Sequence, residues 1–396
     1  MLTSLALIFL LGLSLGGLCA RLHLPPLLGM VVAGLVLGPH ALGLLDPTLL
    51  SISAALRQLA LVVILLRAGL ALDLPSLRRV GRPAVLLCFV PACFEILGCI
   101  VLAPPLLGVT RVEAAVLGSV LAAVSPAVVV PRMLSLMERG LGTRHAIPQM
   151  VLAASSVDDV FVIVMLTVTT GLAAGGSFTP LTLFQVPVSI LLGLLAGAAV
   201  GLAFVRFFRA VHVRDSAKVL VLLSLGFLLL EAETRLKAIG LPLSGMLGIM
   251  AMGLATFRLY PELAARLSAK LSRLWVAAEV LLFTLVGAAA DPGYALAAGA
   301  AAVALIFGAL TFRMAGVGLS VAGTPLTARE RLFTAIAYTP KATVQAAVGG
   351  VPLAMGLACG NLALALAVLS ILLTAPIGAF AIDQTAPWLL APREKT

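Results

Sequence analysis

The sequence predicts an all-α polytopic membrane protein with about 13 transmembrane helices. Of its 396 residues, 62% are hydrophobic and only 11% are charged, a composition far from that of soluble domains. Long apolar runs alternate with short connectors that are charged or rich in Pro and Gly, as expected for successive membrane spans. The net charge of +10 is explained by the connectors, so no nucleic-acid partner is expected.

The predicted spans follow from the apolar runs, because crossing the hydrocarbon core takes about 20 residues of helix. The runs at 25–38 and 217–232 are short for an untilted span. The chain contains 37 glycines, which favours helix packing through small residues. The thirteen predicted spans are 2–20, 25–38, 51–72, 83–103, 113–134, 147–174, 183–207, 217–232, 239–257, 272–290, 294–321, 330–350 and 360–382.

The basic residues predict the orientation of these spans. Most of the 26 Lys and Arg residues fall in alternate connectors, and the other set of connectors holds only Arg111, Arg235 and Lys237. Because basic residues accumulate on the cytoplasmic side, we expect the N-terminus outside and the C-terminus in the cytoplasm. The Arg-rich, Ala/Leu/Gly-rich composition favours the inner (plasma) membrane of a bacterium.

No connector is long enough to house the chemistry of an enzyme, so function is expected among the helices. The five cysteines have neither the spacing of a zinc site nor that of a secreted disulfide framework. We therefore expect no enzymatic activity and no cofactor.

Two adjacent carboxylates, Asp158 and Asp159, lie halfway along the predicted span 147–174. An ionised side chain near the middle of the bilayer costs about 2.5 to 3.5 kcal/mol on insertion scales. Adjacent helix positions point about 100° apart, so the two carboxylates can face different partners. We expect one to meet a fixed cation and the other an ion pathway.

Two spans are interrupted by proline at matching depth, with Pro126 followed by Pro131 in the first and Pro340 in the second. Because proline removes a backbone donor and clashes with the preceding turn, Pro126 and Pro340 should break their helices. In the predicted topology the two spans run in opposite directions, as in an inverted repeat whose broken helices cross at a binding site. The polar residues around the breaks are Ser125, Lys341, Thr343 and Gln345.

The other charges predicted inside the membrane are Glu95, Arg313 and Lys341. With Asp158 and Asp159 they make three acids against two bases, and most must be paired because the cost of unpaired charges would exceed the stability of a protein. A structural ion pair between Glu95 and Arg313 is favoured, and Lys341 can serve the dipoles of the half-helices. The surplus carboxylate is the candidate for a mobile cation or proton.

Four motifs in this order resemble the cation/proton antiporter superfamily of the monovalent cation:proton antiporter 2 type, and most closely the NHA-type sodium/proton antiporters. The motifs are Arg67–Asp73, Ser125–Pro131, Ser156–Asp159 and Pro340–Ala347. The resemblance implies that Asp159 is the cation and proton site and that Asp158 assists it or pairs with a base. It also implies that Glu95 and Arg313 match a pair kept near the site.

The resemblance further implies a homodimer that works by elevator-type alternating access. An ion-binding core would comprise about 83–174 and 294–382, and a dimerisation part about 1–72 and 183–290. Well-studied electrogenic members place a lysine where Arg313 lies. Because arginine stays protonated, the usual inference of two protons per cation does not follow, and stoichiometry remains open.

The expected function is exchange of Na⁺ or Li⁺ for protons, since a proton and a cation can compete for one carboxylate. Oxygen ligands from Asp159, Asp158 and Ser125 suit such hard cations. The ligands do not separate Na⁺ from K⁺, so a potassium/proton antiporter is an alternative. A cation channel and an organic-anion symporter are further alternatives, although two aspartates would repel an anionic substrate.

Overall fold

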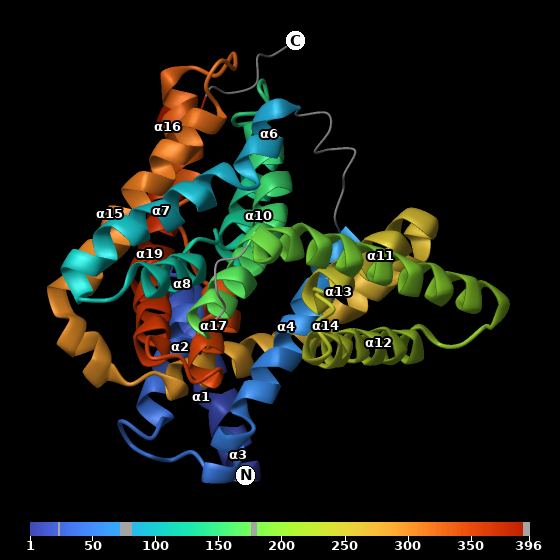
Figure 1. The fold of residues 1–396 in the computed structure, drawn as a ribbon. Coiled ribbons are helices and arrows are strands. Elements are labelled where there is room, and N and C mark those ends of the chain that lie inside the picture. The colour runs from blue at the N-terminus through green and yellow to red at the C-terminus, as the bar shows by residue number, and fades with distance from the viewer. Residues whose placement is uncertain (23, 72–80, 176–179, 391–396) are drawn as a thin grey trace. The chain divides into compact units, whose positions relative to one another are not determined.

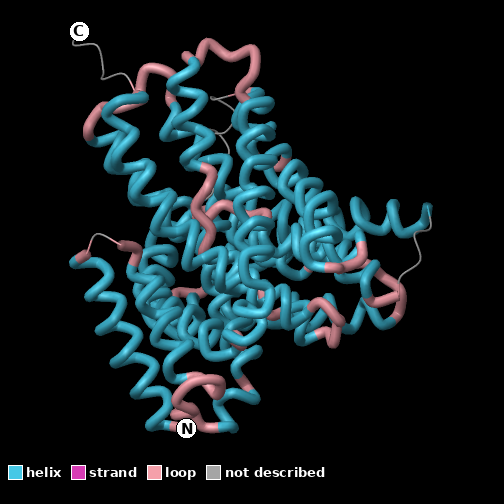
Figure 2. The backbone as a smooth tube through the Cα atoms, turned by 90° about the vertical axis from the view of Figure 1, so that its left-hand side faces the viewer, coloured by secondary structure: helices cyan, strands magenta, loops and turns pink. Residues whose placement is uncertain are grey.

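The computed structural model describes residues 1–22, 24–71, 81–175 and 180–390, and these residues form helices and loops without a β-strand (Figures 1 and 2). The helices are α1 (Leu2–Arg21), α2 (Pro26–Leu37), α3 (Pro47–Ser51), α4 (Ser53–Ala71), α6 (Arg82–Leu87), α7 (Val90–Leu107), α8 (Arg111–Leu121), α9 (Pro126–Glu138), α10 (Ile147–Ala173), α11 (Pro180–Ala210), α12 (Asp215–Ala238), α13 (Gly245–Leu259), α14 (Pro261–Ala289), α15 (Pro292–Ser320), α16 (Ala328–Ala337), α17 (Thr343–Val348), α18 (Val351–Ala354) and α19 (Gly360–Leu389).

The chain is an all-helical membrane protein. Within the described residues, nine helical stretches are long and apolar enough to cross a membrane, and three further apolar helices are shorter. Each of the thirteen predicted spans contains one or two helices, but the count of thirteen crossings stays a prediction. The nine long stretches are Leu2–Arg21, Ser53–Leu70, Arg82–Leu107, Arg111–Glu138, Ile147–Ala173, Val188–Ala210, Pro261–Ala289, Gly299–Ser320 and Gly360–Leu389.

Helix α14 begins earlier than predicted, at Pro261 instead of residue 272. Its first turns carry Glu262, Arg266 and Lys270, so hydropathy does not reveal them. They are helical because proline is favoured at the first helical position and an acidic residue is favoured in the first turn. The helix therefore begins with a charged stretch that precedes its apolar, membrane-spanning part.

The chain divides into two compact units, one formed by Met1–Ala54, Asp73–Gly175 and Leu282–Thr396 and the other by Ala55–Leu72 and Gly176–Leu281. Within the second unit, α11 packs closely against α13. A Cβ added at Gly197 would collide with the backbone carbonyl of Gly248. This close approach of two backbones is the small-residue packing that the glycine content predicts.

Two helices of the first unit are interrupted by non-helical backbone. Helix α8 ends at Leu121 and α9 begins at Pro126, while α16 ends at Ala337 and α17 begins at Thr343. The backbone N–H of Ser125 donates to the carbonyl oxygen of Pro340 at 2.8 Å, which places the two interruptions in contact. Pro131 lies within α9, whose helix continues to Glu138, so only Pro126 marks this break.

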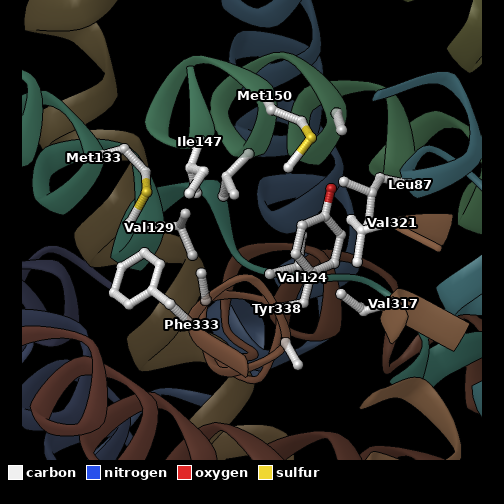
Figure 3. Packing of buried hydrophobic residues seen from close by; sticks show 14 of the residues in the cluster. Leu87, Val124, Val129, Met133, Ile147, Met150, Val317, Val321, Phe333 and Tyr338 are labelled. Carbon is white, nitrogen blue, oxygen red and sulfur yellow. The ribbon is translucent and has the colours of Figure 1, made fainter. Parts of the chain in front are cut away.

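A cluster of buried apolar side chains supports one side of these interruptions. It joins α6, α9, α10, α15, α16 and α19. Figure 3 shows the side chains from α10 and α16 facing one another across it. The members labelled there are Leu87, Val124, Val129, Met133, Ile147, Met150, Val317, Val321, Phe333 and Tyr338. Packing of this kind fixes the approach of α10 to the second break.

The N-terminus of α16 is fixed by a capping box in which Thr327 and Glu330 exchange hydrogen bonds. Glu330 is only 3% exposed, and its Oε1 lies 2.9 Å from Nδ1 of His145, which precedes α10. We expect Glu330→Ala to lower the free energy of unfolding by about 1 to 3 kcal/mol, because both the cap and the partly buried contact with His145 are lost. Thermal unfolding in detergent measures the change.

Glu113 provides a matched control for this prediction, because it forms the same capping box with Thr110 on α8 in an exposed position. Glu113→Ala is expected to cost less than about 1 kcal/mol. Equal losses from the two substitutions would show that the contact between His145 and Glu330 adds nothing to stability.

Candidate functional site

Four ionisable side chains of the first unit are fully buried and lie together beside the two interruptions. They are Glu95 from α7, Asp158 from α10, Arg313 from α15 and Lys341 from the second break, each 0% exposed. Charges are stable at such positions only when they are paired and hydrogen-bonded. The contacts among them therefore define the electrostatics of the site.

Arg313 lies at the centre of this network. Its Nη1 donates to Oε2 of Glu95 at 2.9 Å, and its Nη2 donates to Oδ2 of Asp158 at 2.7 Å. Its Nε donates to the carbonyl oxygen of Tyr338 at 2.9 Å, and Nη1 also donates to the carbonyl oxygen of Ala122. One guanidinium thus holds two carboxylates and the backbone of both breaks.

Lys341 is the second base of the network. Its Nζ lies 2.6 Å from Oε1 of Glu95 and donates at 2.6 Å to the carbonyl oxygen of Leu121, the last residue of α8. A cation is stabilised at the C-terminal end of a helix, where the backbone carbonyls are unpaired. Lys341 therefore binds the C-terminal end of one half-helix, α8, and also neutralises Glu95.

The first break is held by side chains that bind its backbone. The N–H of Val124 donates to Oδ2 of Asp158 at 2.9 Å. The Nε2 of Gln345 donates to the carbonyl oxygens of Leu121 at 3.0 Å and Ala123 at 2.9 Å. These contacts supply hydrogen-bond partners to backbone groups that have lost their helical partners. Backbone polar groups inside a membrane need such partners because lipid offers none.

The polar side chains around the second break lie close to the first. Ser125 and Thr343 face each other with 3.5 Å between their hydroxyl oxygens, and the N–H of Lys341 donates to Oγ1 of Thr374 at 3.0 Å. Ser125 is fully buried. The structure thus brings Ser125, Thr343 and Gln345 into one site with the charged network.

Asp159 differs from the other acids. It makes no hydrogen bond or ion pair with the part of the chain that the structure describes, and its Oδ1 is buried without a partner. Its electrostatic neighbours are Asp158 and Arg313, and Arg313 is already bound to two carboxylates. Asp159 is therefore the carboxylate that neither Arg313 nor Lys341 pairs with.

Sequence reasoning missed that Arg313 binds Asp158 as well as Glu95, and that backbone groups of the breaks complete the network. The only sequence signal that one base binds two acids was the excess of three acids over two bases. Of the Arg67–Asp73 motif, Asp73 lies outside the described residues, so the pairing of that motif is not described.

Comparison with known proteins identifies the family. The family model described as "Sodium/hydrogen exchanger, transmembrane" matches residues 5–387. The chain belongs to the sodium/hydrogen exchanger family. This exchanger is accordingly a multi-pass membrane transporter and not an enzyme, and the resemblance that the four motifs indicated is confirmed.

Two relatives of this exchanger illustrate the match. It is 32% identical over 383 residues to mouse sodium/hydrogen exchanger 9B2, covering 94% of this chain and 69% of the relative. It is also 32% identical over 389 residues to human sodium/hydrogen exchanger 9B1, covering 93% of this chain and 73% of the relative.

The fold of this exchanger is similar to that of a solved antiporter. The structure of the sodium proton antiporter MjNhaP1 from Methanocaldococcus jannaschii at pH 8 superimposes with a TM-score of 0.85 and covers 98% of each chain. The identity is only 20%, so this likeness concerns the fold alone.

Proposed function

We propose that this sodium/proton exchanger binds Na⁺ or Li⁺ and protons alternately at Asp159. The observation that carries the proposal is that the carboxylate of Asp159 has no partner among the described residues, whereas Glu95 and Asp158 are bound to Arg313 or Lys341. A carboxylate without a fixed counter-charge binds either a proton or a mobile cation. Competition between the two ions at one oxygen pair then couples their movements.

The ligands proposed for the cation are oxygens. Asp159 supplies its carboxylate, Asp158 supplies Oδ1, which has no partner among the described residues, and Ser125 supplies its hydroxyl or carbonyl. Hard oxygen ligands favour Na⁺ and Li⁺ over softer metals. Among the described residues no group of three or more His, Cys, Asp or Glu side chains could hold a metal ion.

The proposed movement is elevator-type alternating access. The contact between the breaks at Ser125 and Pro340 supports an inverted repeat of two crossed broken helices, with residues 83–174 and 294–382 as the moving core. Residues 1–72 and 183–290 would form the scaffold and the interface of a homodimer. The predicted topology places the N-terminus outside and the C-terminus in the cytoplasm of a bacterial inner membrane.

The function is tested in proteoliposomes with an acidic interior that contain a fluorescent pH dye. Addition of Na⁺ or Li⁺ to the outside is expected to alkalinise the interior, and K⁺ serves as the comparison. A response to K⁺ equal to that to Na⁺ would select the potassium/proton alternative. A cation flux that moves no protons would identify a channel.

The network also predicts stoichiometry. Arginine does not release its proton, and Asp158 is held by Arg313 and by the N–H of Val124. Asp159 is then the one carboxylate of the network free to exchange, so one proton should move per Na⁺ and transport should be electroneutral. The exchange rate is expected to stay unchanged when a K⁺ gradient and valinomycin impose a membrane potential. Acceleration by a potential of one sign and inhibition by the other would contradict this.

A further inference from the structure

The hydroxyl of Tyr338 is a buried polar group that the network does not use. The side chain is 1% exposed, and its oxygen has no hydrogen-bond partner among the residues that the structure describes. Figure 3 shows the hydroxyl directed from the second break toward the side of the apolar cluster formed by Met150 and Leu87. Buried hydroxyls are nearly always hydrogen-bonded, so an exception calls for an explanation.

Tyr338 is tied to the site through its backbone and its ring. Its carbonyl oxygen accepts from Nε of Arg313 at 2.9 Å, and the guanidinium carbon of Arg313 lies 5.4 Å from the centre of the tyrosine ring. The same guanidinium holds Asp158 at 2.7 Å. Any movement of Arg313 or of the second break therefore moves Tyr338 with the site.

The charged and titratable groups that lie near enough to act on Tyr338 electrostatically include Asp158 and Asp159 from α10, Arg313 from α15 and Cys88, which follows α6. Tyr338 also belongs to the cluster of buried apolar side chains shown in Figure 3. Phenylalanine would fill the same apolar space without burying an unpaired oxygen. A tyrosine at this position thus lowers the stability of the described state. A partner for its hydroxyl in another state of the protein would explain why a tyrosine is present.

Three further buried oxygens of the site also have no hydrogen-bond or ion-pair partner among the described residues, namely Oδ1 of Asp158, Oδ1 of Asp159 and Oε1 of Gln345. Tyr338 is the C-cap residue of α16, with φ −93° and ψ 7°, and the non-helical break follows it. Because Tyr338 adjoins the non-helical residues of this break, a change in the break can turn its ring from Met150 and Leu87 toward Asp158 and Asp159. The unpaired oxygens of Tyr338, Asp158 and Asp159 come from neighbouring elements and are suited to surround one hard cation.

We propose that Tyr338 is a specificity-determining residue whose hydroxyl supplies an oxygen ligand to the bound cation, directly or through one bound water. This rests on the proposed function, in which the cation binds at Asp159. The hydroxyl then has its partner in the cation-loaded state and lacks one in the described state. A ligand from a separate element sets the size of the cation site, so it can discriminate between cations of different radius.

The test is Tyr338→Phe, measured as initial rates of exchange over a range of Na⁺ and Li⁺ concentrations. The apparent KM for Na⁺ is expected to rise about fivefold to tenfold, as for loss of one hydrogen-bonding ligand, with kcat changed by less than about twofold. The ratio of the KM values for Li⁺ and Na⁺ is expected to shift. The melting temperature without cation should be unchanged or higher, because an unpaired oxygen is removed.

The matched control is Tyr260→Phe, which deletes the same atom in the other unit of the chain and should leave both KM values unchanged. KM values of Tyr338→Phe within twofold of the wild type for both cations would overturn the proposal. The stabilisation of the detergent-solubilised protein by added Na⁺, read as a shift in melting temperature, gives a second measurement that needs no transport. A smaller shift in Tyr338→Phe supports the proposal, and an equal shift contradicts it.

These outcomes differ from a failure of the proposed function. If Asp159 were not the cation site, Asp159→Asn would keep the thermal shift caused by Na⁺. If only the role of Tyr338 were wrong, Asp159→Asn would lose the shift and Tyr338→Phe would keep it.

Discussion

Asp159→Asn is expected to reduce Na⁺/H⁺ exchange to the background of empty liposomes while the protein remains folded. Asparagine has nearly the same shape as aspartate, but it neither carries a negative charge nor takes up a proton in the physiological range. Because Asp159 has no ion pair in the described structure, its neutralisation leaves no partner charge unpaired. Uptake of radioactive Na⁺ into proteoliposomes measures the loss.

Asp383→Asn is the matched control for this substitution. Its carboxylate lies on α19, is 54% exposed and pairs with Arg132, so the same chemical change occurs at a surface ion pair of small energetic value. Exchange by this variant should equal that of the wild type. Exchange retained by Asp159→Asn at more than a few per cent of the wild-type rate would remove Asp159 from the mechanism.

Arg313→Gln is expected to cause the largest loss of stability, about 3 to 5 kcal/mol, because it leaves buried charge without compensation. Glu95 keeps Lys341 as a partner, whereas within the described part of the chain Asp158 keeps only the N–H of Val124. Thermal unfolding in detergent measures the effect. Arg235→Gln, at a side chain 80% exposed and paired with Glu231, should cost less than about 1 kcal/mol.

The double variant Arg313→Gln/Asp158→Asn distinguishes an unpaired charge from a loss of packing. Removing the stranded carboxylate should recover part of the stability that Arg313→Gln loses, so the two substitutions should not be additive. If the double variant is less stable than Arg313→Gln by the full cost of Asp158→Asn alone, the two side chains are not coupled and the ion pair does not hold the site together.

The candidate site was largely predictable because charge is rare in this sequence. Asp158, Asp159 and Glu95 each interrupt an apolar run, so composition alone marks them and requires bases to neutralise them. The prolines at 126 and 340 likewise mark breaks because proline cannot continue a helix. Both signals are local in sequence, so they can be recognised without knowledge of the tertiary structure.

The pairing itself was not predictable from the sequence. Whether Arg313 binds Glu95, Asp158 or both depends on the approach of α7, α10 and α15, which no spacing encodes. The bond from Val124 to Asp158 involves a backbone N–H and leaves no residue-type signal. Tyr338 was overlooked for a related reason, since a tyrosine among apolar residues is indistinguishable in sequence from an ordinary core side chain.

The central claim is that a proton and Na⁺ compete for Asp159, and proton release tests it most directly. Na⁺ is added to the detergent-solubilised protein in weakly buffered solution at a pH where exchange is active, and a pH indicator records the protons released. We predict release of about one proton per Na⁺ bound at saturation, as expected for competition at one carboxylate, and no release from Asp159→Asn. Saturable Na⁺ binding without proton release, or equal release from Asp159→Asn, would contradict the account.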